Sequence, residues 1–368
     1  MIRQNIKGNI VLIGLTHKLY SRADALSNIM SSKLGFYKIF MHVPHRLPPL
    51  LQLIVANVYV LVKLLWIMMK YKSKIIILID FSYMLTPVAF TLKKLGFIKY
   101  LIYDDADYAP IFSKNIVSKA LVGFLEILGI RTADMVISAS EVLKRFRSSI
   151  VGEKKVYVVP NGIDNIFCKV HYRNRPFDIA YLGHIDDSYI HFTNMLEALT
   201  NLCKEKSIKV IITGSGKDSA KTHHYMRKCR GIKFLGTVRR EQATLLLSSS
   251  KIGIAPYRIR GHARYGDPLK IKEYLVTTLC VAVSDIMYVK YFLTKVNACY
   301  EIIDDPSPEG IAHTINKLLH KIQENYKIIW NSHLVIKDHL CTNYSWDILT
   351  VQYVKAILDL EEDSRWVV

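Results

Sequence analysis

The chain has 368 residues, of which 51% are apolar and 22% are charged, so its composition excludes a disordered protein and predicts large buried cores. This length exceeds one ordinary core and suits two domains of about 150–200 residues each. The 50 Lys and Arg against 31 Asp and Glu give a formal net charge of +19, which indicates an anionic partner: nucleic acid, acidic lipid or a phosphorylated substrate. Nucleic acid is the least favoured, because the basic residues are scattered and no recognition motif with interleaved aromatics is found.

The N-terminus and the cysteines both indicate a cytosolic protein. The opening run "MIRQNIKGNIVLIGLTHK" has too short an apolar stretch for a signal peptide and predicts a first strand. The six cysteines are far apart, a spacing that fits neither a zinc site nor a small disulfide scaffold and suits a reducing compartment. They are Cys168, Cys203, Cys229, Cys280, Cys299 and Cys341.

Short β-branched runs alternate with longer helical stretches along the whole chain. This alternation predicts an α/β protein with parallel sheets covered on both faces. A polar, turn-rich break near 161–178 divides the pattern into two doubly wound domains. The predicted strands are 9–15, 37–43, 74–80, 99–104, 134–140 and 155–160 in the first half, and 177–183, 209–216, 231–236, 251–257, 279–285 and 298–303 in the second.

The segment 47–74 holds about 20 mostly apolar residues and is borderline for a membrane span. Lys63 lies near its middle, where it would be costly in hydrocarbon. Three interpretations stay open: a helix buried in the domain, a helix lying in the bilayer surface, and a true span. Lys70, Lys72 and Lys74 keep the surface interpretation open, because anionic lipid attracts such clusters.

Ligands of open α/β sheets bind beyond the carboxyl ends of the strands, so the residues after each strand are the candidates. In "VIITGSGKDSA", Gly214 and Gly216 would let the backbone approach a ligand, and the following helix start offers N–H groups to an anion. Gly183 closes the strand 177–183 in a similar way. An ordinary strand-to-helix turn explains these glycines equally well.

The stretch 254–275 is richer in candidate binding residues. Arg258, Arg260, Arg264 and Lys270 bring four cations close to one strand end. We expect Asp267 to be the N-cap of a helix that begins with Pro268, a favoured combination.

Lys270 and Glu273 share one face of that helix. A solvated Lys–Glu pair is the ordinary interpretation and would contribute about 0.2–0.5 kcal/mol. At a strand end, however, the helix start and Lys270 suit a diphosphate. Glu273 suits a neutral diol, because a carboxylate accepts hydrogen bonds from both ribose hydroxyls.

The ordered set of motifs resembles the GT-B glycosyltransferases, in particular the glycosyltransferase family 4-like group with its glucuronosyltransferase-like and teichuronic-acid-type members. The resemblance covers nearly the whole chain. The motifs are "VYVVPNGIDNIF", "IAYLGHID", "VIITGSG", "IKFLGTVRREQATLLLSSSKIGIAPY", "DPLKIKEYLVTTLCVAVSD" and "YSWDILTVQYVKAIL".

This resemblance implies the GT-B fold, with two Rossmann-like domains facing a central cleft. It implies an acceptor-binding domain at 1–165, a nucleotide-sugar-binding domain at 170–344, and a last helix at about 345–368 that packs back on the first domain. It also implies a nucleotide-diphosphate sugar as donor, with no cofactor and no metal.

Carried over residue by residue, Glu273 matches the family glutamate that binds the donor ribose, and Gly214 and Gly216 match its glycine-rich turn. The chain departs from the family pattern twice. Tyr265 stands where many members have a second glutamate facing the transferred sugar. The run "HIDDSYIHF" lacks the Arg/Lys pair that neutralises the diphosphate, so Lys270 or a nearby arginine such as Arg258 is expected to replace it.

The run "LIYDDADYAP" places Asp104, Asp105 and Asp107 where the family's first domain contributes an active-site group. An inverting transfer needs a general base, and any of the three carboxylates could supply it. Alternatively, Asp104 or Asp105 caps the following helix or forms a salt bridge to the other domain. His17 and Arg22, which follow the first strand, are weaker candidates for acceptor contacts.

These observations predict a glycosyltransferase of hexosyl or glycuronosyl type, with retaining and inverting outcomes both open. It would use a UDP- or GDP-sugar and a lipid-linked or polysaccharide acceptor in cell-surface glycan synthesis. The expected location is the cytoplasm, peripheral on the inner face of the cell membrane, with an anionic membrane surface as a further partner. The alternative is a non-catalytic GT-B protein that binds nucleotide sugar as a partner or regulator.

Overall fold

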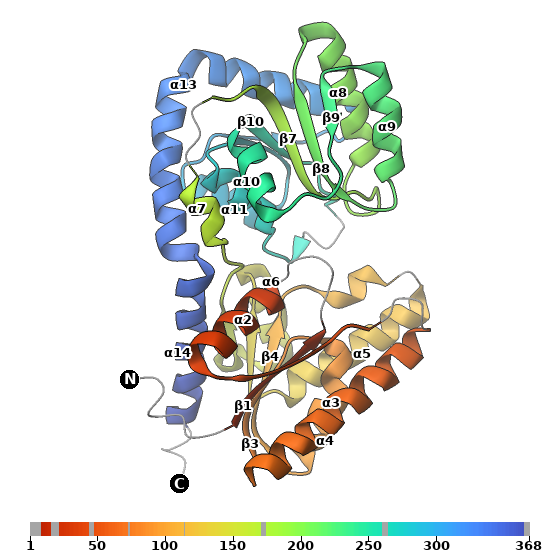
Figure 1. Ribbon diagram of the computed structural model, residues 1–368, viewed down its shortest axis with the longest axis vertical. Coiled ribbons are helices and arrows are strands. Elements are labelled where there is room, and N and C mark those ends of the chain that lie inside the picture. The colour runs from red at the N-terminus through yellow and green to blue at the C-terminus, as the bar shows by residue number, and fades with distance from the viewer. Residues whose placement is uncertain are drawn as a thin grey trace. The chain divides into compact units, whose positions relative to one another are not determined.

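The computed structural model describes residues 9–15, 22–43, 48–72, 74–113, 115–170, 174–259 and 264–363 (Figure 1). It divides into two compact units: Met1–Pro160 with Trp346–Val368 (unit 1), and Asn161–Ser345 (unit 2). Each unit contains one parallel six-stranded sheet with helices on both faces, so the predicted α/β class with two doubly wound units is confirmed. Each of the twelve predicted strand ranges overlaps an observed strand.

The sheet of unit 1 has the strand order β2-β1-β3-β4-β5-β6. This order reverses direction between β1 and β3, which makes the carboxyl ends of these strands the expected ligand edge. The strands are β1 (Asn9–Leu15), β2 (Tyr37–Met41), β3 (Ile75–Asp80), β4 (Ile98–Asp105), β5 (Met135–Ser138) and β6 (Val156–Val158).

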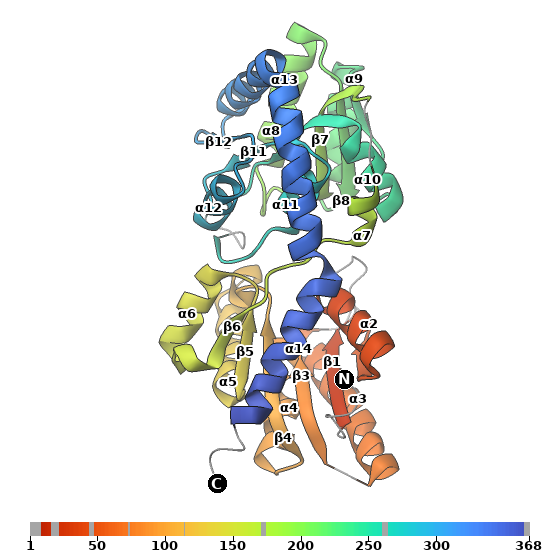
Figure 2. The same ribbon diagram turned by 90° about the vertical axis from the view of Figure 1, so that its left-hand side faces the viewer.

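Alternate residues of the unit 1 strands pack against two helix layers, as the period of a strand requires. Val11 and Ile13 face the layer of α3 (Pro49–Tyr71), α4 (Thr86–Lys94) and α5 (Ile116–Thr132). Ile10 and Leu12 face α2 (Arg22–Leu34) and α14 (Trp346–Asp363). Figure 2 shows α14 along this second face. α6 (Glu141–Val151) precedes β6.

The sheet of unit 2 has the strand order β12-β11-β10-β7-β8-β9, with its reversal between β7 and β10. The strands are β7 (Phe177–His184), β8 (Val210–Ser215), β9 (Ile232–Phe234), β10 (Ser250–Ala255), β11 (Cys280–Ser284) and β12 (Tyr300–Ile303). The helices are α7 (Asn165–Lys169), α8 (Phe192–Lys206), α9 (Ser219–Lys228), α10 (Arg240–Ser248), α11 (Leu269–Val276), α12 (Met287–Lys295) and α13 (Pro308–Tyr344), which is interrupted at Asn325.

The cysteines depart from the pattern that their spacing suggested. Cys168 and Cys341 form a disulfide with 5.8 Å between their Cα atoms, and Cys203 and Cys229 form a second with 6.4 Å. Both lie within unit 2. The sequence spacing of the cysteines does not reveal these pairs, because the helices that carry Cys168 and Cys341 pack together although 173 residues separate them in sequence.

α11 is seated on the unit 2 sheet by Tyr274. Its ring covers Gly253 of β10 so closely that a Cβ atom there would lie 2.4 Å from the ring. Its hydroxyl donates to the carbonyl of Ile254 (3.1 Å) and accepts from the N–H of Leu182 in β7 (3.2 Å). One side chain therefore joins the two strands at the point where the sheet reverses.

We expect Tyr274→Phe to lower the free energy of unfolding by about 1–3 kcal/mol, because the Leu182 N–H and the Ile254 carbonyl lose a buried partner. Urea unfolding followed by circular dichroism measures this change. Tyr291→Phe, at a hydroxyl-bearing side chain that is 62% exposed, is the control and should be neutral. Equal stability of the two variants would show that the hydroxyl does not hold the strands.

Candidate functional site

Lys270 places its ammonium group at the strand-order reversal of unit 2. Its Nζ lies 3.3 Å from the hydroxyl of Tyr181, 4.5 Å from the centre of the Tyr181 ring and 5.2 Å from that of Tyr257. It also lies against Gly183, where a Cβ atom would be 2.8 Å from Nζ. The second residue of α11 thus lies beside the carboxyl end of β7, where doubly wound sheets bind ligands.

Burial lowers the pKa of Lys270 to about 8, because the desolvated ammonium group loses hydration, and the nearby carboxylate of Glu273 only partly opposes this. A diphosphate in contact with Nζ would stabilise the charged form and raise this pKa, so the position favours an anion.

Glu273 is buried beside Arg240, the first residue of α10. Its Oε1 lies 2.8 Å from Arg240 Nη1, and the Arg240 guanidinium is stacked 4.8 Å over the ring of Phe167. Burial raises the pKa of Glu273, and the Arg240 charge opposes that shift. Arg240 is not among the residues predicted for this site, although its position after the predicted strand 231–236 was a usable signal.

Asp267 does not cap α11, because the N-cap is Pro268. Its buried carboxylate instead forms an ion pair with Lys272 and accepts from the N–H of Asn161 at 2.8 Å. Asn161 in turn donates to the Asp267 carbonyl at 2.7 Å and accepts from Lys272 at 2.7 Å. This network fixes the "PNG" turn to the start of α11, so Asp267 positions the helix in this structure.

Close packing between β7 and β8 accounts for the glycines. Gly183 and Gly214 are register partners with φ of +140° and +138°, and a Cβ atom on Gly214 would lie 1.8 Å from the Gly183 carbonyl oxygen. The N–H of Gly214 donates to Gly236 and that of Gly216 to Ser219. Their packing needs no ligand, and a donor contact at these glycines stays a prediction.

Arg258 and Tyr265 lie in the loop region after β10. Arg258 is exposed, and its guanidinium donates to the carbonyl of Asp187 in the loop after β7. Tyr265 is half-buried, with the Arg264 guanidinium 5.7 Å from its ring centre. Arg260 lies outside the described residues. Donor contacts by Arg258 and Tyr265 stay predictions.

In unit 1, Asp104, the next-to-last residue of β4, forms a buried pair with Arg22. Arg22 Nε lies 2.9 Å from Oδ1 and Nη2 lies 3.0 Å from Oδ2, while Nη1 donates to the Val159 carbonyl at 2.7 Å. The structure thus pairs a predicted base, Asp104, with a predicted acceptor contact, Arg22. The guanidinium ties the end of β4 to the segment after β6, which is a positioning role.

Asp105 is likewise held by Arg147, with Nε 2.7 Å from Oδ2 and Nη2 3.0 Å from Oδ1. Arg147 Nη2 also lies 2.9 Å from Glu126 Oε1. Burial raises the pKa values of both carboxyls, that of Glu126 to about 7, and the shared Arg147 charge opposes the shift. Asp104 and Asp105 therefore do form salt bridges, but with arginines of unit 1 and not with the other domain as expected.

Asp107 is half-buried in the bend after β4, and neither bidentate arginine pair described above includes it. Asp80 at the end of β3 was missed: it is buried, accepts from the Ser82 N–H at 2.9 Å, and burial raises its pKa to about 8. It lies at the strand-order reversal of unit 1. His17 lies outside the described residues.

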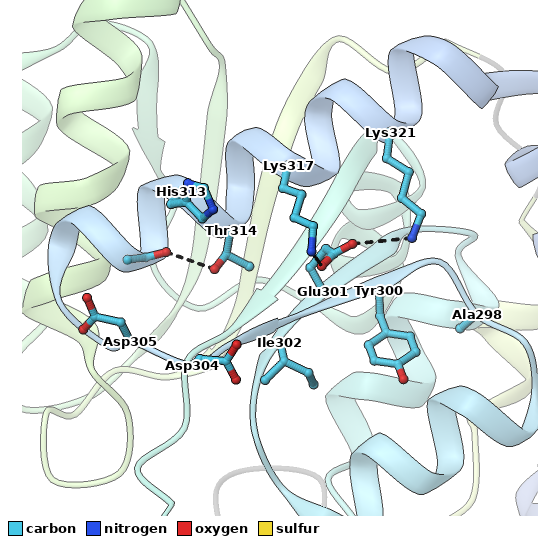
Figure 3. A pocket seen from close by; sticks show the side chains of 11 residues that line it. Ala298, Tyr300, Glu301, Ile302, Asp304, Asp305, His313, Thr314, Lys317 and Lys321 are labelled. Carbon is cyan, nitrogen blue, oxygen red and sulfur yellow. Dashed lines mark hydrogen bonds and ion pairs between the residues drawn. The ribbon is translucent and has the colours of Figure 1, made fainter.

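A separate hollow of about 510 Å³ lies beside the edge strand β12 of the unit 2 sheet, between β12 and the start of α13 (Figure 3). Lys317 and Lys321 both point at Glu301 there, with distances of 2.6 and 3.5 Å. Because these cations are already paired, the hollow is a weaker anion site than the one at Lys270. Within the described ranges, no cluster of three or more His, Cys, Asp or Glu side chains is placed to hold a metal ion.

Residues 176–321 match the sequence profile of the family "Glycosyl transferases group 1". The matched range contains β7, β8, β10 and α11, and so Lys270, Glu273 and Arg240. No curated protein is significantly similar to the chain in sequence.

Solved structures with the same fold cover almost the whole chain. HepE from Anabaena in complex with UDP-glucose has a TM-score of 0.69 at 13% identity, over 96% of this chain and 100% of that one. A glycosyltransferase from Rickettsia africae has 0.65 at 13%, over 96% and 99%. WaaG, a glycosyltransferase involved in lipopolysaccharide biosynthesis, has 0.62 at 10%, over 92% and 97%. At these identities the likeness establishes the fold alone, and it confirms the predicted α/β GT-B fold.

We expect UDP affinity to be constant from pH 7 to the Lys270 pKa of about 8, and to fall about tenfold per pH unit above it, because only the charged amine attracts the diphosphate. Calorimetric titration between pH 7 and 9.5 measures this. Lys270→Arg keeps its charge throughout and should bind with a pH-independent affinity over this range. A flat wild-type profile would remove Lys270 from the diphosphate contact.

We expect Arg147→Met to lower the free energy of unfolding by about 3–5 kcal/mol at pH 8, because two buried carboxyls lose their shared cation. Their raised pKa values mean that the folded state holds more protons than the unfolded state, so stability falls as pH rises and the loss should be smaller at pH 5. Arg145→Met, at an exposed arginine of the same helix, is the control. A loss independent of pH would contradict this account.

Proposed function

We propose that the chain is a glycosyltransferase that transfers a sugar from a UDP- or GDP-sugar to a lipid-linked or polysaccharide acceptor. One observation carries the proposal: the segment that matches the glycosyl transferase profile is the segment that places a desolvated cation at the ligand edge of unit 2. The GT-B fold agrees with it. HepE, which shares this fold, binds UDP-glucose.

In this proposal unit 2 binds the donor. Lys270 and the start of α11 receive the diphosphate, and Glu273 accepts hydrogen bonds from the ribose hydroxyls. Arg240 holds the Glu273 carboxylate in place at 2.8 Å. Asp267 and Lys272 act indirectly, because their buried pair fixes the start of the helix that carries both donor contacts.

Unit 1 would bind the acceptor and supply the base for an inverting transfer. The acceptor oxygen forms a bond to the anomeric carbon as the bond from that carbon to the diphosphate breaks, and the acceptor proton passes to a carboxylate. All three aspartates stay candidates for this base. Asp107 is the one we test, because it lies in the bend just beyond the carboxyl end of β4, where ligands of open α/β sheets bind.

A lipid-linked or polysaccharide acceptor is supported by WaaG, which has this fold and is involved in lipopolysaccharide biosynthesis. The second candidate function is a non-catalytic binder of nucleotide sugar. It is favoured by Tyr265, which stands eight positions before Glu273, where many members of the family that the sequence resembles have a second glutamate. Catalytic turnover distinguishes the two.

Release of UDP or GDP from a panel of UDP-hexoses, UDP-glucuronic acid and GDP-hexoses tests the proposal. We expect turnover with one donor, and a loss of about tenfold or more in donor affinity for Glu273→Gln, because the neutral amide is a weaker acceptor for the ribose hydroxyls. Glu241→Gln, on the exposed side of α10, is the matched control. Binding without turnover for every donor would favour the non-catalytic function.

Asp107→Asn should reduce turnover about a hundredfold or more at unchanged donor affinity if the transfer is inverting, and the anomeric configuration of the product, read by NMR, identifies that outcome. Asp304→Asn, at an exposed aspartate of unit 2, is the control. An inverted product with full activity of Asp107→Asn would place the base elsewhere.

A further inference from the structure

α3 exposes an apolar surface that is unusual for a helix packed on a folded unit. Val62 is 58% exposed, Trp66 51% and Met69 69%. Only 22% of its most apolar 18-residue window is buried, and within the described ranges it alone is long and apolar enough to cross a membrane. Its other exposed large apolar residues are Leu50, Leu51, Ile54, Val58, Tyr59, Leu65 and Tyr71.

The neighbouring helices extend this surface. Figure 1 shows α3, α4 and α5 together on one face of the unit 1 sheet, and α4 contacts both of the others. The exposed apolar residues of α5 and of the turn after α4 are Leu95, Phe97, Ile116, Val117, Leu121, Phe124 and Ile127. We call the outer surface of these three helices, with Leu95 and Phe97, the apolar layer. It holds 17 of the 27 exposed large apolar side chains among the described residues, whereas such residues are usually scattered singly over a soluble surface.

The charges of the apolar layer are mostly positive. The three helices contain six basic residues, namely Lys63, Lys70, Lys93, Lys94, Lys119 and Arg131. Lys93 pairs with Asp134, just after α5, at 2.7 Å, so the other five carry the positive charge of the layer. The one acidic residue of the three helices, Glu126, is buried against Arg147 and presents no charge outward. Lys70 lies 4.9 Å from the Trp66 ring centre, an aromatic and cationic pairing suited to lipid headgroups.

α3 is nevertheless built into unit 1. Ala56, Val60, Leu64 and Ile67 form a buried stripe against the core. Asn57 donates to the Met84 carbonyl at 2.7 Å and accepts from the Val88 N–H at 2.9 Å, which ties α3 to the start of α4. A helix crossing a bilayer would lose these bonds, so the geometry favours a helix lying in the bilayer surface.

We propose that the apolar layer docks on the surface of a bilayer that contains anionic lipids, with α3 lying in the plane of the membrane. Apolar side chains enter the boundary between headgroups and acyl chains, and the lysines contact anionic headgroups. The proposal rests on the exposure, charge and anchoring of α3, and it holds whether or not the chain transfers a sugar.

Flotation of the full chain with vesicles of phosphatidylcholine, alone or with 30% phosphatidylglycerol, tests the proposal. We expect binding to the anionic vesicles that weakens in high salt, and partitioning at least about tenfold weaker for Met69→Glu and Val62→Glu. The matched controls are Met287→Glu and Val335→Glu in unit 2, whose apolar side chains are each 70% exposed. They should bind like the wild type, and equal binding of all four variants would overturn the proposal.

Fluorescence quenching by brominated lipid locates the contact. Quenching should disappear largely in Trp66→Phe and persist in Trp330→Phe, because Trp330 lies in unit 2 and contacts Arg175. Unchanged quenching in Trp66→Phe would contradict docking through α3.

Two further outcomes would each overturn in-plane docking. Retention of the expressed protein in membranes after alkaline carbonate extraction would indicate a span. Dimers that Met69→Glu disrupts, combined with no vesicle binding, would show that a second copy covers the apolar layer instead.

Discussion

The structure of unit 2 depends on how α11 is seated on its sheet. Tyr274 covers Gly253 with its ring and joins β7 to β10 through its hydroxyl, at the place where the strand order reverses. Because the backbone positions of a helix are fixed relative to one another, this one contact also brings Lys270 within reach of Gly183 and Glu273 within reach of Arg240. The buried Asp267–Lys272 pair fixes the start of the same helix. The candidate donor site therefore follows from a packing constraint.

The buried charged side chains differ in whether an oppositely charged neighbour compensates them. Asp104, Asp105 and Glu273 each lie beside an arginine, which offsets the cost of removing a carboxylate from water. For Lys270, the nearby carboxylate of Glu273 offsets the effect of burial only in part, and its pKa is lowered to about 8. A charged ligand gains the most binding energy beside a charge that the fold does not fully compensate. Lys270 is therefore a better candidate for a ligand contact than the paired aspartates are.

The formal charge of +19 has more than one use in this chain. Some basic residues pair internally, as Arg22 and Arg147 do. Others surround exposed apolar side chains on α3, α4 and α5 without exposed acidic neighbours on those helices. The same composition thus supports both a phosphorylated substrate and an anionic surface, and the positions of the lysines separate these uses.

The sequence by itself determined the α/β class, the twelve strand positions and the location of Lys270 and Glu273 just after a strand, because strand and helix periods are local properties of the chain. Only the tertiary structure decided which side chains pair with one another. Arg22 reaches Asp104 across 82 residues, Arg240 reaches Glu273, and Cys168 meets Cys341 across 173 residues. It also decided that α3 buries one stripe and exposes the rest. Such pairings depend on which distant segments pack together, and a local pattern of residue types carries no record of that.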